Sequence, residues 1–555
     1  PARNTSYKPP NSPNFLQFRP THPKTTSPPP PEPLTLLNVT PEEASEPAEK
    51  PKTPPSTAGM TTKVVKGSLW TLAGQVAPLA VSLVATPFVI RLLGAESYGV
   101  LILIGLIPTY LGFADFGMSM ASTKFGSEAY AEGDEEKEAR IVRTAALIAL
   151  MTSVPVAAAL MIFAPKVIGL FNVPEALQAE AVTALRIAAV TFVINFLCGI
   201  FNTPQLARLR MDLNTFINAG SRILGLIATP IVLYLGYGII GAVTVLLAAS
   251  LLNLIGHLVV SRRLLPQLVG LSVEHFAFRQ MTRFGGSLAA AGVTIILLNN
   301  IEKGILPAVI SVEALAYYTV AFTLASMMLM FSSAMNQSLV PAFSQLQSAE
   351  NKNHLGSLYS RGIRLTLIWL IPTLVFLLVI GKSFFAFWAG PDFETQSTSP
   401  FYILLLGLIF NIPAYLPYAT LIAAGRTDIF TKLYIAEFIP YLVLVLALTY
   451  YYGVLGAASA WSARMIVDAI LQFSIAKRVV GMPSVSRGVI MILVSGISMI
   501  PPIGVGFYFS EFNLAVLLVY LLSSVIYLVL LYHIALDLHE VKWLKARYSD
   551  RFSNG

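Results

Sequence analysis

The sequence is short of charged residues and has almost no cysteine, and each shortage narrows the class of protein. Charged residues make up 12% of the 555 positions, whereas soluble domains contain about 25%. Hydrophobic residues make up 55%. The single cysteine, Cys198, can form no disulfide within the chain and has too few partners for a metal site. We therefore expect a polytopic membrane protein with no metal centre and no catalytic site.

Residues 1–62 differ in composition from the rest of the chain. They contain 16 of the 36 prolines and show no apolar periodicity, which predicts a disordered segment. They also lack the apolar core of a signal peptide. The first methionine is Met60, so we expect the true start near this residue, with an over-extension before it. The alternative is a proline-rich arm that binds a partner.

Apolar runs of membrane-spanning length follow one another from residue 68 onward. A helix needs roughly 20 apolar residues to cross a bilayer. Fourteen runs meet this length, at about 68–90, 98–118, 142–164, 181–203, 215–235, 237–260, 284–306, 314–340, 362–383, 397–424, 428–450, 454–476, 487–509 and 512–535. The connections are short. The sequence therefore predicts an all-α protein of about fourteen transmembrane helices.

Basic residues between these runs are distributed unequally and predict the orientation. Lys and Arg in short loops favour the cytoplasmic side. If the first run starts in the cytoplasm, cytoplasmic segments carry 24 Lys and Arg, and the opposite loops carry only Arg91, Lys166 and Lys382. Both termini are then cytoplasmic, with residues 536–555 as an amphipathic tail on the lipid surface. Because the net charge of +8 sits beside apolar runs, we expect no nucleic-acid partner.

The chain repeats itself at an almost constant interval. Asn195, Arg210, Asp212 and Thr215 recur 216 residues later as Asn411, Arg426, Asp428 and Thr431. Gly238-Ile239-Ile240-Gly241-Ala242 recurs at a shift of 215 as Gly453-Val454-Leu455-Gly456-Ala457. Such repeats build many secondary transporters, whose substrate site lies at the repeat interface.

The repeat predicts the division of the chain. Residues 63–265 would form a first lobe of six helices and residues 266–480 a second lobe. Because each copy has an even number of spans, both run in the same direction about a pseudo-two-fold axis along the membrane normal. Residues 481–535 would add two C-terminal helices outside the repeat.

Several motifs resemble one known family. They are Gly67-Ser68-Leu69-Trp70, Arg91-Leu92-Leu93-Gly94-Ala95-Glu96-Ser97-Tyr98-Gly99, Ala114-Asp115-Phe116-Gly117-Met118 with Gly133-Asp134-Glu135-Glu136-Lys137, and Asn299-Asn300-Ile301-Glu302-Lys303 with Val312-Glu313-Ala314-Leu315-Ala316-Tyr317-Tyr318. Their order resembles that of bacterial polysaccharide transporters, the flippases of O-antigen-type lipid-linked oligosaccharides. The resemblance covers about residues 63–535. This family usually has Asp-Arg or Asp-Lys where this chain has Glu302-Lys303.

The resemblance implies a substrate, a mechanism and partners. The substrate would be an oligosaccharide linked to undecaprenyl diphosphate, carried by alternating access across the bacterial cytoplasmic (inner) membrane for polysaccharide biosynthesis. Partners would be this substrate and membrane lipids, together with polysaccharide polymerase and chain-length proteins. No cofactor is implied, and the coupling ion would be H⁺ or Na⁺.

A diphosphate cannot cross hydrocarbon unpaired, so its path needs water and cations. Arg186, Arg222, Lys303 and Arg464 lie within the predicted spans and are the candidates. Arg222 has no acidic residue within one turn and is the strongest of them. Arg222 and Arg464 belong to different copies, which makes them candidates to face one shared cavity.

Structural roles compete with this interpretation for the other three residues. Arg464 precedes Asp468 by one helical turn, so the two can neutralise each other on one helix face. Lys303 lies near the outer end of its span, where its long side chain can reach the interface. Arg186 also lies near an outer end, which favours a structural role.

Ion coupling requires a group that changes charge or holds a cation. Glu437, Glu302, Asp468 and Asp115 are the candidates, because burial disfavours the charged form of a carboxyl group. Glu437 fits best as an unpaired carboxyl, although a hydrogen bond between packed helices is the alternative. Asp115 is more typical of a helix end or a gate, and His257 of a structural residue. Polar candidates for the cavity wall are Asn195, Asn411, Asn299 and Asn300.

Two other functions compete with the flippase hypothesis. A cation-coupled multidrug or toxin exporter of the same superfamily would favour an acidic cavity and twelve spans. A membrane-embedded polysaccharide polymerase or ligase would favour a large outer loop with His, Arg or Glu, whereas the predicted outer loops are short and almost uncharged.

Overall fold

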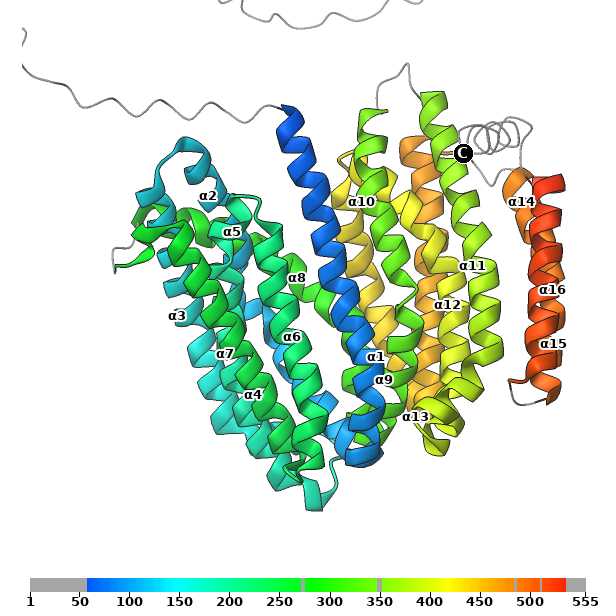
Figure 1. Cartoon of the computed structure of the whole chain (residues 1–555), viewed down its shortest axis with the longest axis horizontal. Helices are drawn as coiled ribbons and strands as arrows, with labels where there is room; N and C mark the ends of the chain where they lie inside the picture. Colours follow the sequence, from blue (N-terminus) through cyan, green and yellow to red (C-terminus); the bar gives the residue numbers. More distant parts are fainter. Residues whose placement is uncertain (1–56, 271–274, 347–351, 484–486, 510–511, 536–555) are drawn as a thin grey trace, which may run out of the picture. The chain divides into compact units, whose positions relative to one another are not determined.

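The computed structural model describes residues 57–270, 275–346, 352–483, 487–509 and 512–535, which are helical and contain no strand within those ranges (Figure 1). The chain divides into two units at residue 57, and the second unit contains the described residues. Eleven helices of the described residues are long and apolar enough to cross a membrane. The predicted all-α, multi-pass membrane protein is confirmed.

The first half of the chain contributes seven α-helices to the described structure. They are α1 (Thr57–Tyr110), α2 (Met118–Glu132), α3 (Glu135–Ile168), α4 (Glu175–Phe201), α5 (Thr203–Ala207), α6 (Met211–Tyr234) and α7 (Gly238–Leu264), with short turns η1 (Leu111–Asp115) and η2 (Pro266–Leu268). Helix α1 consists of two helices joined at Gly94, where φ is 77°. This backbone conformation favours glycine, which has no Cβ atom to clash.

The second half contributes the remaining helices. They are α8 (His275–Val309), α9 (Val312–Ser326), α10 (Leu329–Gln345), α11 (Lys352–Trp388), α12 (Pro391–Ala423), α13 (Thr427–Ile475), η4 (Ala476–Val480), α14 (Arg487–Ser495), η5 (Gly496–Met499), α15 (Ile500–Phe509), α16 (Leu514–Leu530) and η6 (Leu531–Ala535). Helix α13 is broken at Gly453. The predicted count of fourteen spans stays a prediction, because length and composition define eleven.

The sequence repeat reappears in local structure. Helices α6 and α13 each begin after an arginine that pairs with an aspartate two residues on: the Arg210–Asp212 distance is 2.9 Å and the Arg426–Asp428 distance is 3.3 Å. Gly238 and Gly453 also correspond, and their φ angles are 56° and 57°. An acidic residue in the first turn suits the positive end of a helix.

Each half of the chain packs mainly against itself. In the first half, α6 packs on α1 and α7, and α4 packs on α3 and α7. In the second half, α12 packs on α9, α10, α11 and α13, while α14 and α15 pack on α11. The boundaries of the two lobes stay a prediction.

Two close helix crossings join the halves. A Cβ atom added at Gly99 would lie 1.9 Å from the carbonyl oxygen of Val312, and one added at Gly117 would lie 2.7 Å from that of Gly285. Small residues allow backbones to approach this closely in membrane proteins. Helices α8 and α9 therefore lie directly against the chain that runs from α1 to α2.

A second set of contacts, which we call the latch, joins the halves near Gly94. Asn172 follows α3; its backbone N–H donates to Pro307 O (2.7 Å), and its Nδ2 donates to Ala308 O (3.1 Å) and Ile310 O (3.3 Å). Arg91 donates to Phe387 O at 2.7 Å. The last carbonyl groups of a helix have no partner within it, so the latch satisfies the ends of α8 and α11.

Some sequence-based predictions fall outside the described residues. They concern the proline-rich segment up to residue 56 and the amphipathic tail 536–555. Helix α1 begins at Thr57, so residues 57–62 are helical although the composition predicts disorder up to residue 62. Residues 57–62 have no apolar pattern of their own. They are helical because they continue the membrane-spanning helix that follows.

Candidate functional site

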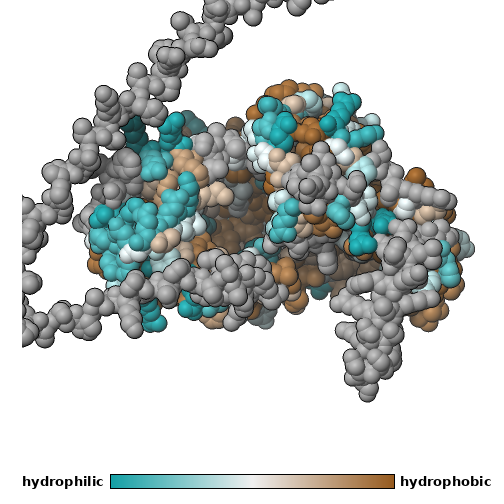
Figure 2. Space-filling model, turned by 90° about the horizontal axis from the view of Figure 1, so that it is seen from above, coloured by the Kyte–Doolittle hydropathy of each residue, from teal (hydrophilic) through white to brown (hydrophobic). Residues whose placement is uncertain are grey.

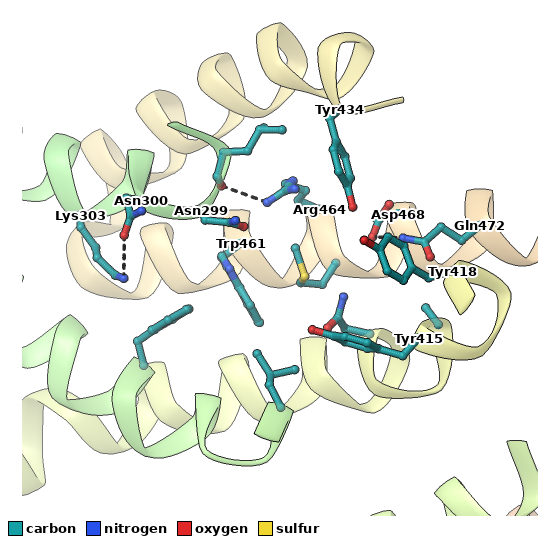
Figure 3. A pocket seen from close by; sticks show the side chains of 16 residues that line it. Asn299, Asn300, Lys303, Tyr415, Tyr418, Tyr434, Trp461, Arg464, Asp468 and Gln472 are labelled. Carbon is teal, nitrogen blue, oxygen red and sulfur yellow. Dashed lines mark hydrogen bonds between the residues drawn. The ribbon is translucent and has the colours of Figure 1, made fainter. Parts of the chain in front are cut away.

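A cavity of about 500 Å³ lies in the second half of the chain, between α8, α9, α10, α12 and α13 (Figure 3). Six of the predicted site residues line it: Lys303, Arg464, Asp468, Asn299, Asn300 and Asn411. We call it the second-half cavity. It combines two cationic side chains with amides, one carboxyl group and several aromatic rings.

Arg464 is anchored in the wall of this cavity rather than free in it. Its side chain is 7% exposed, and its Nε donates to Glu437 Oε2 at 3.3 Å. One terminal nitrogen donates to Leu298 O at 3.0 Å, and the guanidinium lies 5.2 Å from the centre of the Tyr441 ring. Arg464 therefore ties α13 to α8, and it turns only part of its charge toward the cavity.

Two predictions about carboxyl groups are corrected by these contacts. Glu437 is not unpaired, because Arg464 donates to it. Asp468 is not the ion-pair partner of Arg464; it accepts from Gln472 Nε2 at 2.7 Å instead. Glu437 Oε1 and Asp468 Oδ1 have no hydrogen-bond partner among the described residues. The kink at Gly453 brings the two parts of α13 together, and spacing along one helix did not reveal that.

Lys303 is the cavity cation that has no carboxylate within salt-bridge distance among the described residues. Its Nζ donates to Asn300 Oδ1 at 3.1 Å and lies 4.4 Å from the centre of the Phe322 ring. Both partners are neutral. A lysine whose partners are neutral can bind an anion as a compact point charge.

Glu302 points away from the cavity, although it is the neighbour of Lys303. It is fully buried, and Tyr441 donates to its Oε2 at 3.0 Å. Its Oε1 has no hydrogen-bond partner among the described residues. Consecutive residues of a helix do not face the same side, so one helix places a cation in the cavity and an acid in the core.

Aromatic side chains of the wall were not predicted. Tyr415, Tyr418, Tyr434 and Trp461 line the cavity (Figure 3). They come from α12 and from both parts of α13, which the sequence shows only as aromatic residues in apolar runs. The repeat did not reveal them, because Trp461 stands where the first copy has Leu246.

A second cavity, of about 880 Å³, lies in the first half between α1, α4, α6 and α7. Arg222 and Asn195 line it, together with Asn218, Ser221 and Asn253. Arg222 is exposed and has no hydrogen bond or ion pair within the described part of the chain. We call this the first-half cavity. Arg222 lines this cavity and Arg464 lines the second-half cavity, and a cavity shared by the two arginines stays a prediction.

The two cavities are built from corresponding positions of the repeat. Asn195 and Asn411 line the first-half and second-half cavity respectively. The other corresponding pairs are Asn218 and Tyr434, Ala249 and Arg464, Asn253 and Asp468, and Leu246 and Trp461. Equal positions therefore carry different chemistry in the two halves. Helix α8 borders both, through Ile296 on one side and Lys303 on the other.

Two further candidates lie outside both cavities. Arg186 is exposed on α4 and donates to Met161 O at 3.3 Å. Asp115 accepts from the backbone N–H and from the hydroxyl group of Ser119, each at 3.2 Å. Asp115 thus caps the start of α2, which is a helix-end contact.

A buried polar cluster beside the first-half cavity was not predicted. His257 is fully buried, and its ring nitrogens lie 3.2 Å from Gln205 Oε1 and 3.3 Å from Asn218 Oδ1. Nearby, Arg208 pairs with buried Glu138 at 2.6 Å. No group of three His, Cys, Asp or Glu side chains suited to a metal ion occurs in the described ranges.

Comparison with solved structures defines the fold. The chain has the fold of the lipid II flippase MurJ in an inward closed conformation: the TM-score is 0.64 at 16% identity, over 84% of this chain and 99% of that one. A mutant of the Vibrio cholerae MATE transporter VcmN matches with a TM-score of 0.53 at 16% identity, over 78% of this chain and 99% of that one. The fold is that of multi-pass flippases and transporters.

Comparison of sequences defines the family. The profile of the polysaccharide biosynthesis protein family matches residues 88–396, and the chain belongs to this family. A Shigella flexneri protein that carries the name O-antigen transporter is 22% identical over 415 residues, which are 74% of this chain and 96% of that protein. The membrane protein EpsK of Bacillus subtilis is 28% identical over 138 residues, 24% of this chain and 26% of that one.

Proposed function

We propose that the protein is a flippase that moves undecaprenyl-diphosphate-linked oligosaccharide across the bacterial cytoplasmic membrane for surface polysaccharide biosynthesis. The observation that carries the proposal is Lys303, a cation in a polar and aromatic cavity whose only partners are neutral among the described residues. Membership of the polysaccharide biosynthesis family supports it, and so does the fold shared with a lipid II flippase.

The second-half cavity suits the head group of such a lipid. A diphosphate can leave water only if cations compensate its negative charge. Lys303 can bind it as a point charge, and Arg464 lines the same cavity. Amides of Asn299 and Asn411 can exchange hydrogen bonds with sugar hydroxyl groups. The rings of Trp461 and Tyr415 can cover the apolar faces of sugar rings. The lipid tail would remain in the bilayer.

The latch supports alternating access. It closes the molecule at the end near Gly94, where Asn172 and Arg91 hold α8 and α11. Figure 2 looks onto the opposite end, at which α1 begins, and shows a hollow lined by hydrophobic residues. With both termini in the cytoplasm, as the basic residues predict, the head group would enter from the cytoplasm and leave after the latch opens.

Ion coupling is assigned to the carboxyl groups beside Arg464. Glu437 pairs with Arg464, whereas Asp468 accepts from Gln472 and has no cation within salt-bridge distance among the described residues. One negative charge is then left for a bound H⁺ or Na⁺ to neutralise. Glu302 and Asp115 have local partners and are secondary candidates. We propose that no reaction is catalysed.

The experiment is a deletion of the gene in its own host. We expect lipid-linked oligosaccharide to accumulate in the cytoplasmic leaflet, and surface polysaccharide to disappear. Re-expression of the wild-type protein should reverse both effects, and Lys303→Gln at matched membrane expression should not. Normal surface polysaccharide in the deletion strain would contradict the proposal.

Drug export is the second candidate, and one observation favours it. Asp468 lies in a cavity walled by tyrosines and a tryptophan, which can bind an organic cation. Export of cationic dyes that stops in Asp468→Asn, together with normal surface polysaccharide in the deletion strain, would establish this function in place of the first.

A further inference from the structure

The first-half cavity contains a cation that the proposed head-group site does not use. Asn218, Ser221, Arg222 and Gly225 line this cavity, and their spacing places them on one face of α6. Arg222 lies halfway along α6 (Met211–Tyr234), roughly 17 Å from either end at a rise of about 1.5 Å per residue. Its side chain is too short to reach the membrane interface. Its charge must therefore be matched inside the protein, by an acidic side chain, by water or by a bound anion.

No acidic residue of the surrounding elements lies in the cavity wall within the described part of the chain. The wall is built from α1, η1, α4, α6, α7 and α8, and α5 also packs on α6. The acidic residues of these elements are Glu96, Asp115, Glu175, Glu180, Asp212 and Glu302. None of them lines the cavity, so the charge of Arg222 is left for a ligand or for water.

Most other polar side chains of the wall already have partners. The hydroxyl groups of Thr109, Thr191 and Ser221 donate to carbonyl groups one turn earlier on their own helices, at 3.0, 3.2 and 2.8 Å. Asn253 Nδ2 donates to Asn218 Oδ1 at 3.1 Å. The side chains left without a hydrogen bond among the described residues are Arg222, Asn195 and Ser250. The wall thus offers one charge and few free polar groups.

Much of the remaining wall is apolar and aromatic. Phe192 and Phe196 come from α4, with ring centres 4.5 Å apart, and Leu226 and Leu246 come from α6 and α7. The cavity volume of about 880 Å³ falls within the range of about 300–1,000 Å³ in which sites enclose a whole small molecule. An apolar chain gains free energy when it leaves water for such a wall.

One cation in an apolar wall is complementary to a ligand with one negative group and an apolar chain. We propose that the first-half cavity binds an amphiphilic anion. Its phosphate or carboxylate group contacts Arg222, and its chain lies against Phe192, Phe196 and Leu226. A guanidinium group suits either head group, because its planar fork of donors matches two oxygen atoms at once. The ligand differs from the diphosphate and sugars assigned to the second-half cavity, and the proposal does not rest on the transport function.

Two substitutions test the head group and the chain separately. Arg222→Gln removes the charge and leaves no partner unpaired, so the variant should fold. Gly105→Leu fills the cavity from α1, since Gly105 lines it and a Cβ atom added there meets nothing within 4 Å. Arg222→Lys restores a cation. Arg263→Gln is the control, because Arg263 is an exposed arginine in the last turn of α7.

Binding is measured by native mass spectrometry of the purified protein in a non-ionic detergent. The probes are oleate and oleoyl lysophosphatidate, which carry a carboxylate and a phosphate on the same chain, and 1-oleoylglycerol, which carries that chain without a charge. We expect wild-type protein to bind the anions about tenfold or more tightly than the neutral lipid, because hydrogen bonds to charged groups are strong. Tighter binding of one anion identifies the head group that the cavity prefers.

The variants distinguish the cavity from the outer surface of the protein. Arg222→Gln should reduce the affinity for the anions to that for the neutral lipid, Arg222→Lys should recover part of it, and Arg263→Gln should match the wild type. Gly105→Leu should weaken binding of all three lipids. Equal affinity of wild-type protein for charged and neutral lipids, or unchanged anion binding in Arg222→Gln, would overturn the proposal. The assay involves no translocation, so it decides the site even if the proposed flippase function fails.

Discussion

The two cavities occupy corresponding positions in the two halves of the chain, yet their walls differ in chemistry. The first-half cavity is walled mainly by apolar side chains, with the amides of Asn195, Asn218 and Asn253, a few hydroxyl groups and the exposed Arg222 among them. The second-half cavity carries Lys303, Arg464 and Asp468 among aromatic rings. Asn195 and Asn411 are corresponding positions of the repeat that carry the same polar residue in both cavities. A shared backbone therefore positions the side chains, and substitution at a few positions decides what each cavity can bind.

The difference in chemistry indicates that the two cavities have different roles. Ionic and aromatic groups suit a diphosphate and its sugars, so the second-half cavity is the better head-group site. The first-half cavity has a mainly apolar wall with one cation, Arg222, and it lies beside a buried hydrogen-bond cluster at His257. Helix α8, which borders both cavities, is the element through which one half can influence the other.

The largest effect is expected from breaking the ionic cluster of the second-half cavity. Glu437→Leu leaves the buried Arg464 without its carboxylate partner, and an uncompensated buried charge costs about 3–5 kcal/mol. We expect a large fall in the thermal stability of the purified protein. The double variant Glu437→Leu/Arg464→Leu should recover most of it. Equal stability of single and double variants would show that the pair is not a structural unit.

A smaller effect is expected on transport when the head-group cation is removed. Lys303→Gln should slow translocation by about tenfold or more, since a hydrogen bond to a charged group contributes about 1.5–3 kcal/mol. Lys382→Gln is the control, because Lys382 pairs with Glu394 at 3.7 Å outside both cavities. Translocation rates at equal protein density provide the measurement. Equal slowing in both variants would remove Lys303 from the path.

The latch offers a way to change access to both cavities at once. Asn172→Ala removes two side-chain hydrogen bonds to α8 and its C-terminal end, each contributing about 1 kcal/mol. The state open at that end should become about thirtyfold more populated relative to the closed state. Spin labels at Leu170→Cys and Phe387→Cys, in a Cys198→Ala background, report the distance between the halves. An unchanged distance distribution would contradict the role of the latch.

The smallest effect is expected from Arg222→Gln. Its side chain is exposed and unpaired among the described residues, and exposed charges contribute up to about 1 kcal/mol. Translocation should slow by about twofold to fivefold. A loss as large as that of Lys303→Gln would reverse the comparison and make the first-half cavity the main phosphate site.

Much of the fold could be predicted from the sequence, because membrane spans need long apolar runs and the repeat is visible as matching residues. Lys303, Asn299 and Asn411 were predicted as separate candidates, but the sequence did not show that they line one cavity. The repeat was informative where it preserved a residue, as in Asn195 and Asn411. It was silent where the two copies had diverged.

Contacts between helices could not be predicted. Spacing along one helix favoured Arg464 with Asp468, whereas the kink at Gly453 brings Glu437 to Arg464. Arg222 and Arg464 line the cavities of their own halves, and a cavity shared by the two stays a prediction. The interval of four between Asn253 and His257 was a usable signal for the polar cluster, but its partners Gln205 and Asn218 come from other helices.

The most direct test is translocation by the purified protein. Proteoliposomes containing undecaprenyl-diphosphate-linked oligosaccharide are assayed for the fraction of head groups that cross the bilayer with time. The account predicts that the wild-type protein and Lys382→Gln move the lipid at equal rates, and that Lys303→Gln is slower by about tenfold or more. No movement by the wild-type protein, or equal rates in all three, would contradict it.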